Sequence, residues 1–232
     1  MNPNVKFKNG AMTPFQARRR WLGAFAAGAG AVALAGCDRA VDNARIDATL
    51  RSAEKLTFAS QRLLLDHQPL AKEYGERDLS PVFRANGTTM PSTPAYAKLL
   101  QGGFVDYRLR VDGLVQRPQA LSLAELRAMK SRTQITRHDC VEGWSAIGKW
   151  QGVPLSLVLD AFHPQTILAY GMNGKDLPVA HGAPLRLRIE RQLGYKQAKY
   201  VNRIEVVDAY SRLNGGKGGF WEDRGYEWYA GI

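Results

Sequence analysis

The clearest hydrophobic pattern begins after residue 104, where apolar and charged side chains alternate along the chain. From Tyr107 to Val111 every second residue is apolar, and the residues between them are arginines. A period of two predicts a strand with one face buried and the other in solvent. Asp112-Gly113 follows at once and predicts the turn that ends this strand.

Helix signals are shorter and depend on capping residues. Ser122 stands three residues before Glu125, which predicts a short helix closed by a capping box. Pro154 precedes an apolar stretch that ends at Leu159 and predicts a second helix, because proline is favoured in a first turn. Residues 38–72 are polar and helix-prone, so a further helix is expected there.

The remaining segments are strand-like or irregular. Strands are predicted at residues 131–140, 165–170, 184–190 and 200–207. Residues 73–103 carry three prolines and four glycines and are predicted to be mostly loop. Separated strands mixed with short helices predict an α+β fold.

The first thirty-six residues have the pattern of an export signal. Arg18 to Arg20 precede an apolar run from Trp21 to Leu34, which is shorter than the roughly 20 residues of a permanent membrane helix. The arginines resemble a twin-arginine signal, and the segment Leu34–Cys37 resembles a lipoprotein cleavage box. These resemblances imply periplasmic export, with Cys37 as the lipidated first mature residue. Asp38 resembles an inner-membrane retention signal.

The net charge of the chain limits the classes of molecule that it is expected to bind. The whole chain has a formal net charge of +11, and removing residues 1–36 takes away five basic residues and no acidic one, which leaves +6 on 196 residues. That length suffices for one domain with a core. A positive balance suits nucleic acid, anionic lipid or an anionic cofactor, and export argues against nucleic acid. The predicted parts are a signal (1–36), a tether and helix (37–75), a main domain (76–212) and an aromatic, glycine-rich tail (213–232).

Candidate chemistry centres on one thiol, because Cys140 is left alone once Cys37 carries lipid. Cys140 ends a predicted strand, where Arg137 is close by and His138 shares its face. Three roles are open, namely a buried structural thiol, a covalent nucleophile with a histidine base, or a metal ligand. No second Cys or His stands at a zinc-like interval, so spacing does not choose among them.

The residues around Cys140 resemble a known motif. Cys140-Val141-Glu142-Gly143-Trp144-Ser145, followed by Trp150-Gln151-Gly152-Val153-Pro154-Leu155, is similar to the molybdenum-ligand motif of the sulfite oxidase fold. The resemblance is closest to the catalytic subunit of the periplasmic methionine sulfoxide reductase. It implies a molybdopterin-binding fold of mixed sheets, short helices and long loops. It also implies that the Cys140 thiolate binds molybdenum, together with a single pyranopterin.

The same resemblance implies further cofactor-binding residues, which are Asn86, His181, Arg186, Gly194, Tyr195, Lys196 and Lys199. A guanidinium and lysines suit the phosphate of a pterin cofactor. The amide of Asn86 can donate and accept at once, and Gly194 allows close backbone approach. For Lys199 a solvated surface charge is the alternative.

The pattern of the family breaks between Leu155 and His163. Seven residues stand there in place of several tens. Either neighbouring segments close the gap, or the chain is a shortened variant with a weakened or absent active site. A non-catalytic lipoprotein that keeps the fold is therefore one alternative for the function.

The reaction that the resemblance implies is a two-electron oxygen-atom transfer, with the chemistry carried by the cofactor. Reduction of a sulfoxide is the first expectation, and oxidation of sulfite or a similar sulfur oxyanion is the alternative. Electrons must pass through a partner, since the chain has no Cys-x-x-Cys-His haem motif. The expected partner is a membrane haem protein or cytochrome, near which the lipid anchor at the inner membrane would hold the enzyme.

Overall fold

The computed structural model describes residues 44–64, 70–159 and 163–232. The chain divides into two compact units, Met1–Thr57 and Phe58–Ile232, so the boundary falls inside helix α2 (Ala44–Leu64). This helix lies in the segment where the sequence predicts one. In the part of the chain described here, no helix is both long and apolar enough to cross a membrane. The export signal and the lipidation site at Cys37 lie outside the described residues.

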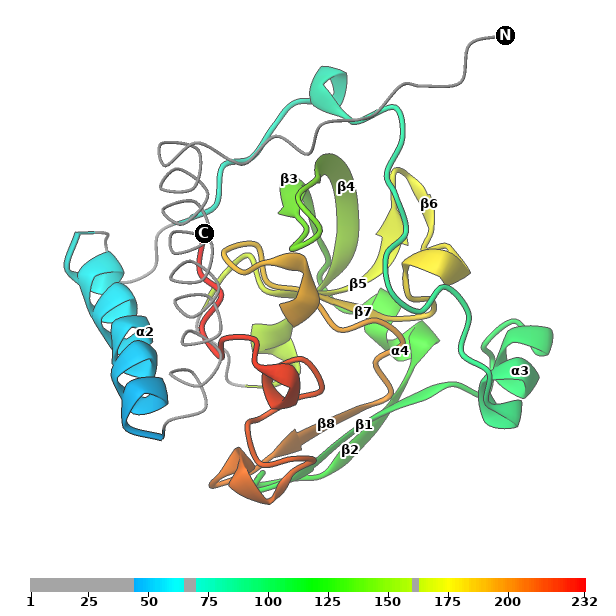
Figure 1. The fold of residues 1–232 in the computed structure, drawn as a ribbon. Helices are drawn as coiled ribbons and strands as arrows, with labels where there is room; N and C mark the ends of the chain where they lie inside the picture. The colour runs from blue at the N-terminus through cyan, green and yellow to red at the C-terminus, as the bar shows by residue number, and fades with distance from the viewer. Residues whose placement is uncertain (1–43, 65–69, 160–162) are drawn as a thin grey trace, which may run out of the picture. The chain divides into compact units, whose positions relative to one another are not determined.

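The second unit is built on two sheets (Figure 1). The smaller sheet has the strand order β2 (Gln119–Ser122), β1 (Arg108–Gly113) and β8 (Arg203–Val206). The larger sheet runs β3 (Arg132–Asp139), β4 (Ser145–Pro154), β5 (Ile167–Met172) and β6 (Lys175–Asp176), and β7 (Arg186–Arg188) also pairs with β5. Only the β1–β8 pair is parallel among these described strands, so the unit contains a mixed sheet and an antiparallel one. The α+β prediction is confirmed.

Short helices and turns connect the strands. The α-helices of this part are α3 (Pro94–Gln101) and α4 (Leu123–Ala128). Single 3-10 turns lie at Glu76–Asp78, Leu155–Leu157, Val179–His181, Gly194–Lys196, Tyr210–Arg212 and Glu222–Arg224. The capping box of α4 is confirmed, because Glu125 N–H donates to Ser122 Oγ at 3.1 Å and Ser122 N–H donates to Glu125 Oε2 at 2.7 Å.

Residues 73–103 are mostly loop, as predicted, but they also contain α3, which begins where Thr93 Oγ1 accepts from Tyr96 N–H at 3.3 Å and Pro94 occupies the first position. A proline there starts a helix rather than breaking one.

The helix predicted from Pro154 was wrong, since Pro154 is the last residue of β4 and one 3-10 turn, Leu155–Leu157, follows it.

Strand β4 was missed by the sequence analysis, although its burial alternates along most of its length. The buried positions include Ala146, Gly148 and Gly152, and such small residues hide the alternation of a strand. Gly152 has a packing reason, because a Cβ there would lie 2.2 Å from the carbonyl oxygen of Leu168 in β5. This is the place where the register between β4 and β5 shifts.

The shortened centre of the chain leaves no missing strand between β4 and β5. These strands pair directly, with Pro154 opposite Ile167 and Val153 opposite Leu168. The connection that contains Leu155 and His163 therefore joins two neighbouring antiparallel strands. Of the two alternatives for the gap, neighbouring segments close it.

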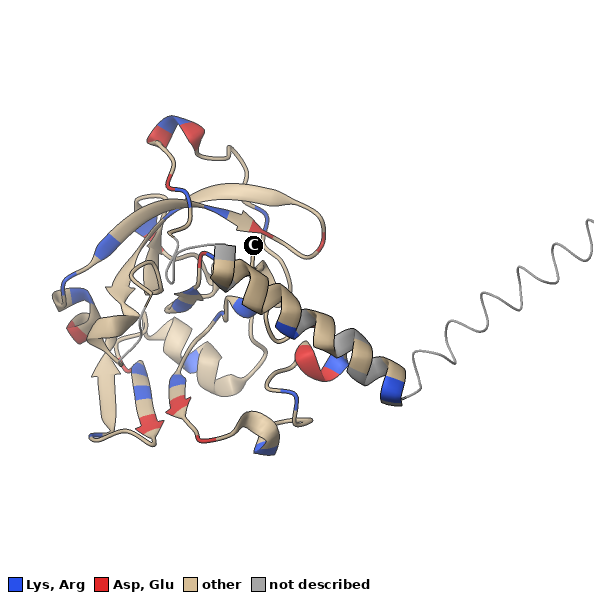
Figure 2. Ribbon diagram, turned by 90° about the vertical axis from the view of Figure 1, so that its left-hand side faces the viewer, with Lys and Arg blue, Asp and Glu red and all other residues tan. Residues whose placement is uncertain are grey.

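Two hydrophobic clusters form the core. The larger one joins the smaller sheet to the larger one, with Leu109, Leu126 and Leu168 fully buried. The second gathers around Trp150 and Ile167. Full burial of one leucine stabilises the fold by roughly 1.5–3 kcal/mol. Lys and Arg are interspersed with Asp and Glu over the ribbon (Figure 2).

Candidate functional site

Cys140 is the first residue after β3 and lies in the tight connection to β4. Its N–H donates to Trp144 O at 2.9 Å, and Gly143 N–H donates to Cys140 O at 3.0 Å. Gly143 has φ +84°, a conformation that favours glycine. The thiol is free and the residue is only 6% exposed. The turn thus holds a buried thiol in a defined place.

A distant loop brings an amide to this thiol. Asn86 Nδ2 lies 3.3 Å from Cys140 Sγ and donates to it, although the two residues are 54 positions apart. Lys199 Nζ in turn donates to Asn86 O at 2.7 Å, to Ala180 O at 3.0 Å and to Thr88 O. The three N–H bonds of the lysine are therefore all used, and the loop that carries Asn86 is fastened beside Cys140.

Arg186 is the most unusual charge of the site. It is 1% exposed on β7, and its Nη1 donates to His181 O at 3.0 Å. Its Nε has no hydrogen-bond partner among the described residues, and no carboxylate in that part of the chain forms an ion pair with it. Burial and the nearby Arg188 lower the pKa of Arg186 to about 9, whereas the charges of Glu190, Tyr200 and Cys140 act in the opposite direction. A buried cation of this kind calls for an anion.

Lys199 adds a second positive charge near Arg186, and His181 adds a neutral polar ring. Burial, followed by the charges of Arg186 and Lys199, lowers the pKa of His181, so its ring is neutral at pH 7. Burial and Arg186 also lower the pKa of Lys199 to about 8. His181 Nδ1 is buried without a partner in the described chain. The groups around Cys140 are thus suited to a ligand that is anionic and rich in hydrogen-bond acceptors.

A second cluster of buried polar side chains consists of Arg188, Glu190, Gln134 and His138. Arg188, which is fully buried, pairs with Glu190 at 2.6 Å, and its Nη1 lies 3.1 Å from His138 Nδ1. Gln134 Nε2 donates to Glu190 Oε1 at 2.8 Å. Burial, with the charges of Arg188 and Arg186, lowers the pKa of His138 to about 2. The imidazole is neutral, and since Arg188 can only donate, the ring proton lies on Nε2.

Sequence reasoning missed the pairing of Arg188 with Glu190. A signal was available, because Arg186, Arg188 and Glu190 occupy every second position of a predicted strand and therefore share one face. Charges that alternate with apolar residues normally mark the solvent side of a strand. Here both faces of β7 are covered, so the charged face had to find partners inside the protein.

Gly194 lies against this group. A Cβ at Gly194 would come within 2.5 Å of His138 Cε1 and 2.6 Å of His138 Nε2, so only glycine fits. The group that packs against this glycine is thus the imidazole of His138, and close approach of the cofactor to Gly194 stays a prediction.

Comparison with known proteins identifies the family. A family model described as an oxidoreductase molybdopterin-binding domain matches residues 101–166 and 160–213. The protein-methionine-sulfoxide reductase subunit YedZ1 of Azospira oryzae is 33% identical over an alignment of 242 positions, which covers 93% of this chain and 88% of that protein. The chain belongs to the molybdopterin-binding oxidoreductases.

Other relatives match only in part. The protein-methionine-sulfoxide reductase catalytic subunit MsrP of Xanthomonas axonopodis pv. citri is 32% identical over an alignment of 145 positions, which covers 44% of this chain and 45% of that subunit. The chain thus matches under half the length of this relative. The crystal structure of the sulfane dehydrogenase SoxCD from Paracoccus pantotrophus shares 23% identity and a TM-score of 0.41, over 45% of this chain and 39% of that one.

The expected family, α+β class and molybdopterin cofactor are therefore confirmed. The residues around Cys140 fit the cofactor, because the unpaired guanidinium of Arg186 suits its anionic parts and the free Nδ1 of His181 suits its polar ring edge. A thiolate is a soft ligand that suits a redox-active metal. Among the described residues no group of three or more His, Cys, Asp or Glu is placed to hold a metal ion. The role of Cys140 as ligand stays a prediction.

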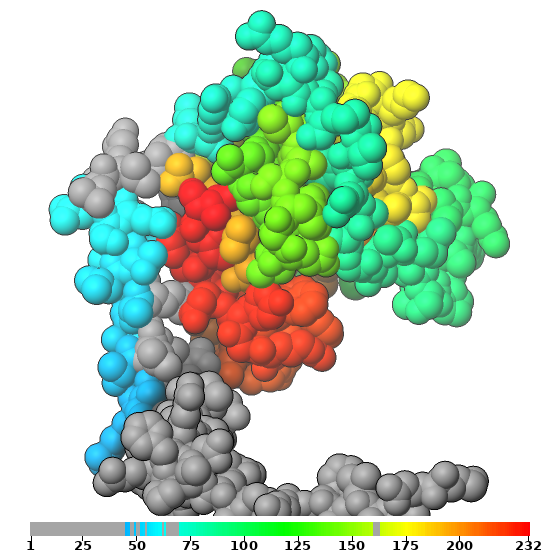
Figure 3. All heavy atoms as spheres, turned by 45° about the horizontal axis from the view of Figure 1, so that its top comes forward, coloured from blue at the N-terminus to red at the C-terminus, as the bar shows by residue number. Residues whose placement is uncertain are grey.

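The remaining predicted cofactor residues lie against the C-terminal tail. Lys196 Nζ forms an ion pair with Glu222 and lies 4.1 Å from the centre of the Trp228 ring. Tyr195 Oη donates to Glu227 O at 2.6 Å. Figure 3 shows the tail (red) beside the orange segment near residue 190, which agrees with a bond of 2.9 Å from Leu193 N–H to a tail carbonyl. To bind a phosphate, Lys196 would have to release the Glu222 carboxylate. Lys199 would have to release one of the backbone carbonyls to which it donates.

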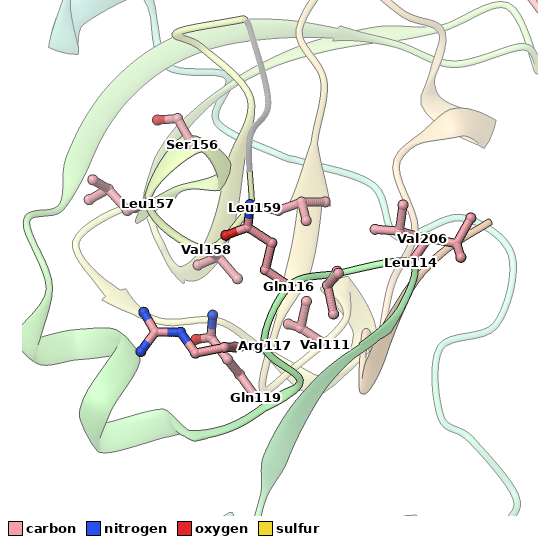
Figure 4. A pocket seen from close by; sticks show the side chains of 11 residues that line it. Val111, Leu114, Gln116, Arg117, Gln119, Ser156, Leu157, Val158, Leu159 and Val206 are labelled. Carbon is pink, nitrogen blue, oxygen red and sulfur yellow. The ribbon is translucent and has the colours of Figure 1, made fainter. Parts of the chain in front are cut away.

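A hollow lies at the shortened connection, at the other end of β4 from Cys140. Its volume is about 460 Å³. The side chains of Val111, Val158 and Leu159 point into it, and Gln116 and Arg117 line its rim (Figure 4). It is separate from the oxidoreductase site, because the ten residues of β4 lie between them.

Proposed function

We propose that this oxidoreductase removes the oxygen atom from a sulfoxide, such as that of oxidised methionine, at a molybdenum centre bound by Cys140. The observation that supports this most is a buried free thiol within electrostatic range of the buried guanidinium of Arg186, which has no ion-pair partner among the described residues. The names of the relatives YedZ1 and MsrP support the substrate class.

The reaction balances as a two-electron reduction. The sulfur–oxygen bond of the sulfoxide breaks, the sulfur becomes a thioether, and the oxygen leaves as water with two protons and two electrons. When bound, the molybdenum cofactor supplies the centre that accepts oxygen and passes electrons. Cys140 would hold that centre, Asn86 would orient the sulfur ligand, and Arg186 would balance negative charge in a site from which burial excludes water.

Electron supply and location are part of the proposal. The electrons would come from a membrane haem protein or cytochrome. Twin-arginine export followed by lipidation of Cys37 would hold the enzyme at the periplasmic side of the inner membrane, within reach of that donor. Substitution Cys37→Ser should release the exported protein into the soluble periplasmic fraction; continued membrane association would count against the anchor.

Metal content tests the site directly. The protein purified after export should contain close to one molybdenum and one pterin per chain. Cys140→Ser should lose the molybdenum while it keeps the fold, because a hydroxyl is a poor ligand where a thiolate is suited. A folded wild-type chain without molybdenum would refute the enzymatic proposal and leave the non-catalytic lipoprotein.

Direction is tested with artificial electron carriers. Methionine sulfoxide should oxidise a reduced viologen dye in the presence of the loaded wild type, and Cys140→Ser should show no turnover. Oxidation of sulfite with ferricyanide is the second candidate, favoured by the positive charges of Arg186 and Lys199. Turnover of sulfite without turnover of the sulfoxide would select this reverse direction.

A further inference from the structure

The loop that carries Asn86 is fixed at three points. At its start, Ser80 N–H donates to Ile147 O at 3.0 Å, and Ile147 N–H donates to Ser80 Oγ at 2.9 Å, so the loop pairs with β4. Near its end, Lys199 holds the carbonyls of Asn86 and Thr88, as described above. The third point is the ring of Phe83, which lies between these two ends.

Phe83 stands at the centre of a ring cluster beside Cys140. Its ring centroid lies 5.4 Å from that of Trp150, 5.5 Å from those of His138 and His181, and 6.3 Å from that of Trp144. Three of these contacts are edge-to-face, a geometry that aromatic rings favour over a face-to-face stack.

The ring of Phe83 packs against Gly148. A Cβ at Gly148 would lie 3.0 Å from Phe83 Cε2 and 3.1 Å from Phe83 Cδ2, so one edge of the ring packs closely against the backbone of β4. The ring and Asn86 are only three residues apart. Movement of the ring would therefore move the amide that donates to Cys140 Sγ.

We propose that Phe83, seated on Gly148, is a positioning residue that keeps the Asn86 amide on the sulfur of Cys140. This inference rests on Cys140 as the molybdenum ligand, as proposed above. A hydrogen bond to a metal-bound thiolate draws electron density from the sulfur, and such bonds tune the potential and the spectrum of a thiolate-ligated metal. Phe83 itself contacts neither the thiol nor the substrate in this account.

A double-mutant cycle in the molybdenum-loaded enzyme tests the coupling. Phe83→Leu and Asn86→Ala should each move the sulfur-to-molybdenum charge-transfer band to longer wavelength, because the sulfur loses its donor. The double variant should show the same band as Asn86→Ala alone. Additive shifts, or no shift in Phe83→Leu, would overturn the proposal.

Phe104→Leu is the matched control. Phe104 is also half-buried and packs against both core clusters, and among the described residues its ring contact is with Tyr96 rather than with Phe83. The Phe104→Leu variant should lower the melting temperature as Phe83→Leu does, and it should leave the sulfur-to-molybdenum charge-transfer band unchanged. A band shift of the same size in Phe104→Leu would show that general loosening of the core is responsible, against the proposal.

Gly148→Ala gives a second, smaller perturbation. The added methyl group should displace the ring of Phe83 and shift the band in the same direction, and combination with Phe83→Leu should add nothing further. If Phe83→Leu fails to load metal, amide exchange of the cofactor-free chain decides. Faster exchange confined to residues 80–88 supports the proposal, and uniformly faster exchange contradicts it. Absence of molybdenum from the wild type refutes the proposed function instead.

Discussion

The buried, neutral His138 should make the fold sensitive to mild acid. Its pKa is held at about 2 in the folded chain against 6.5 for a free imidazole, first by burial and then by the charges of Arg188 and Arg186. Because the pKa of His138 is lower in the folded chain, the unfolded chain binds a proton that the folded chain does not bind. The stabilising contribution is present above pH 6.5 and is lost as the pH falls below it.

The magnitude follows from that difference. At pH 7 the unfolded imidazole is mostly neutral, and at pH 5 it is almost fully protonated. Each unit below 6.5 costs about 1.4 kcal/mol, so the free energy of unfolding should fall by about 2 kcal/mol from pH 7 to pH 5 through His138 alone. The folded ring takes up almost no proton in this range, because its pKa is far lower.

Urea unfolding of the cofactor-free chain at pH 7 and pH 5 measures this loss. His138→Asn is the control variant, because its side-chain oxygen can still accept from Arg188 and it does not titrate. The wild type should lose about 2 kcal/mol more than the variant over this range. Other groups, including His181, cancel in the difference. Equal losses in both proteins would refute the account of His138 as a buried neutral ring.

Three further outcomes follow from the packing. Arg188→Met should lower the free energy of unfolding by about 3–5 kcal/mol, because Glu190 is left as a buried unpaired charge. Adding Glu190→Gln should recover part of the lost free energy, and no recovery would count against the ion pair. Gly194→Ala should cost about 1–3 kcal/mol or more in urea unfolding, since its methyl would overlap His138; a neutral effect would mean that the ring moves freely. Ser122→Ala should cost about 1 kcal/mol in thermal unfolding through the lost cap of α4, and an unchanged melting temperature would deny the cap any contribution.

How far the sequence predicted the fold depended on side-chain size. Strand β1 was found because the residues from Tyr107 to Val111 alternate between large apolar and charged types. Strand β4 was missed because glycines and alanine occupy its buried side, where they make room for Phe83 and for the carbonyl of Leu168. A pattern of hydrophobic positions cannot show a face that is buried by close backbone approach.

In the site, too, some contacts were predicted from the sequence and others were not. The thiol and Asn86 were predicted through resemblance, and the structure brings them within hydrogen-bond distance. The tail contact of Lys196 with Glu222 was not predicted, because no local rule relates residues that lie 26 positions apart in irregular segments. Nor does the sequence of a strand show whether an arginine such as Arg188 faces solvent or a carboxylate in the core.

The parallel pairing of β1 with β8 has a consequence for how the chain reaches its native state. Arg110 lies opposite Arg203, so more than ninety residues must be in place before this edge of the small sheet forms. Contacts between such distant residues slow folding, because the entropy of closing the loop is lost before the pairing compensates it. The hairpin of β3 and β4 can form early from local contacts, whereas the sheet that closes over the larger cluster must wait for residue 206. We therefore expect the Cys140 turn to be protected from amide exchange earlier during refolding than β1.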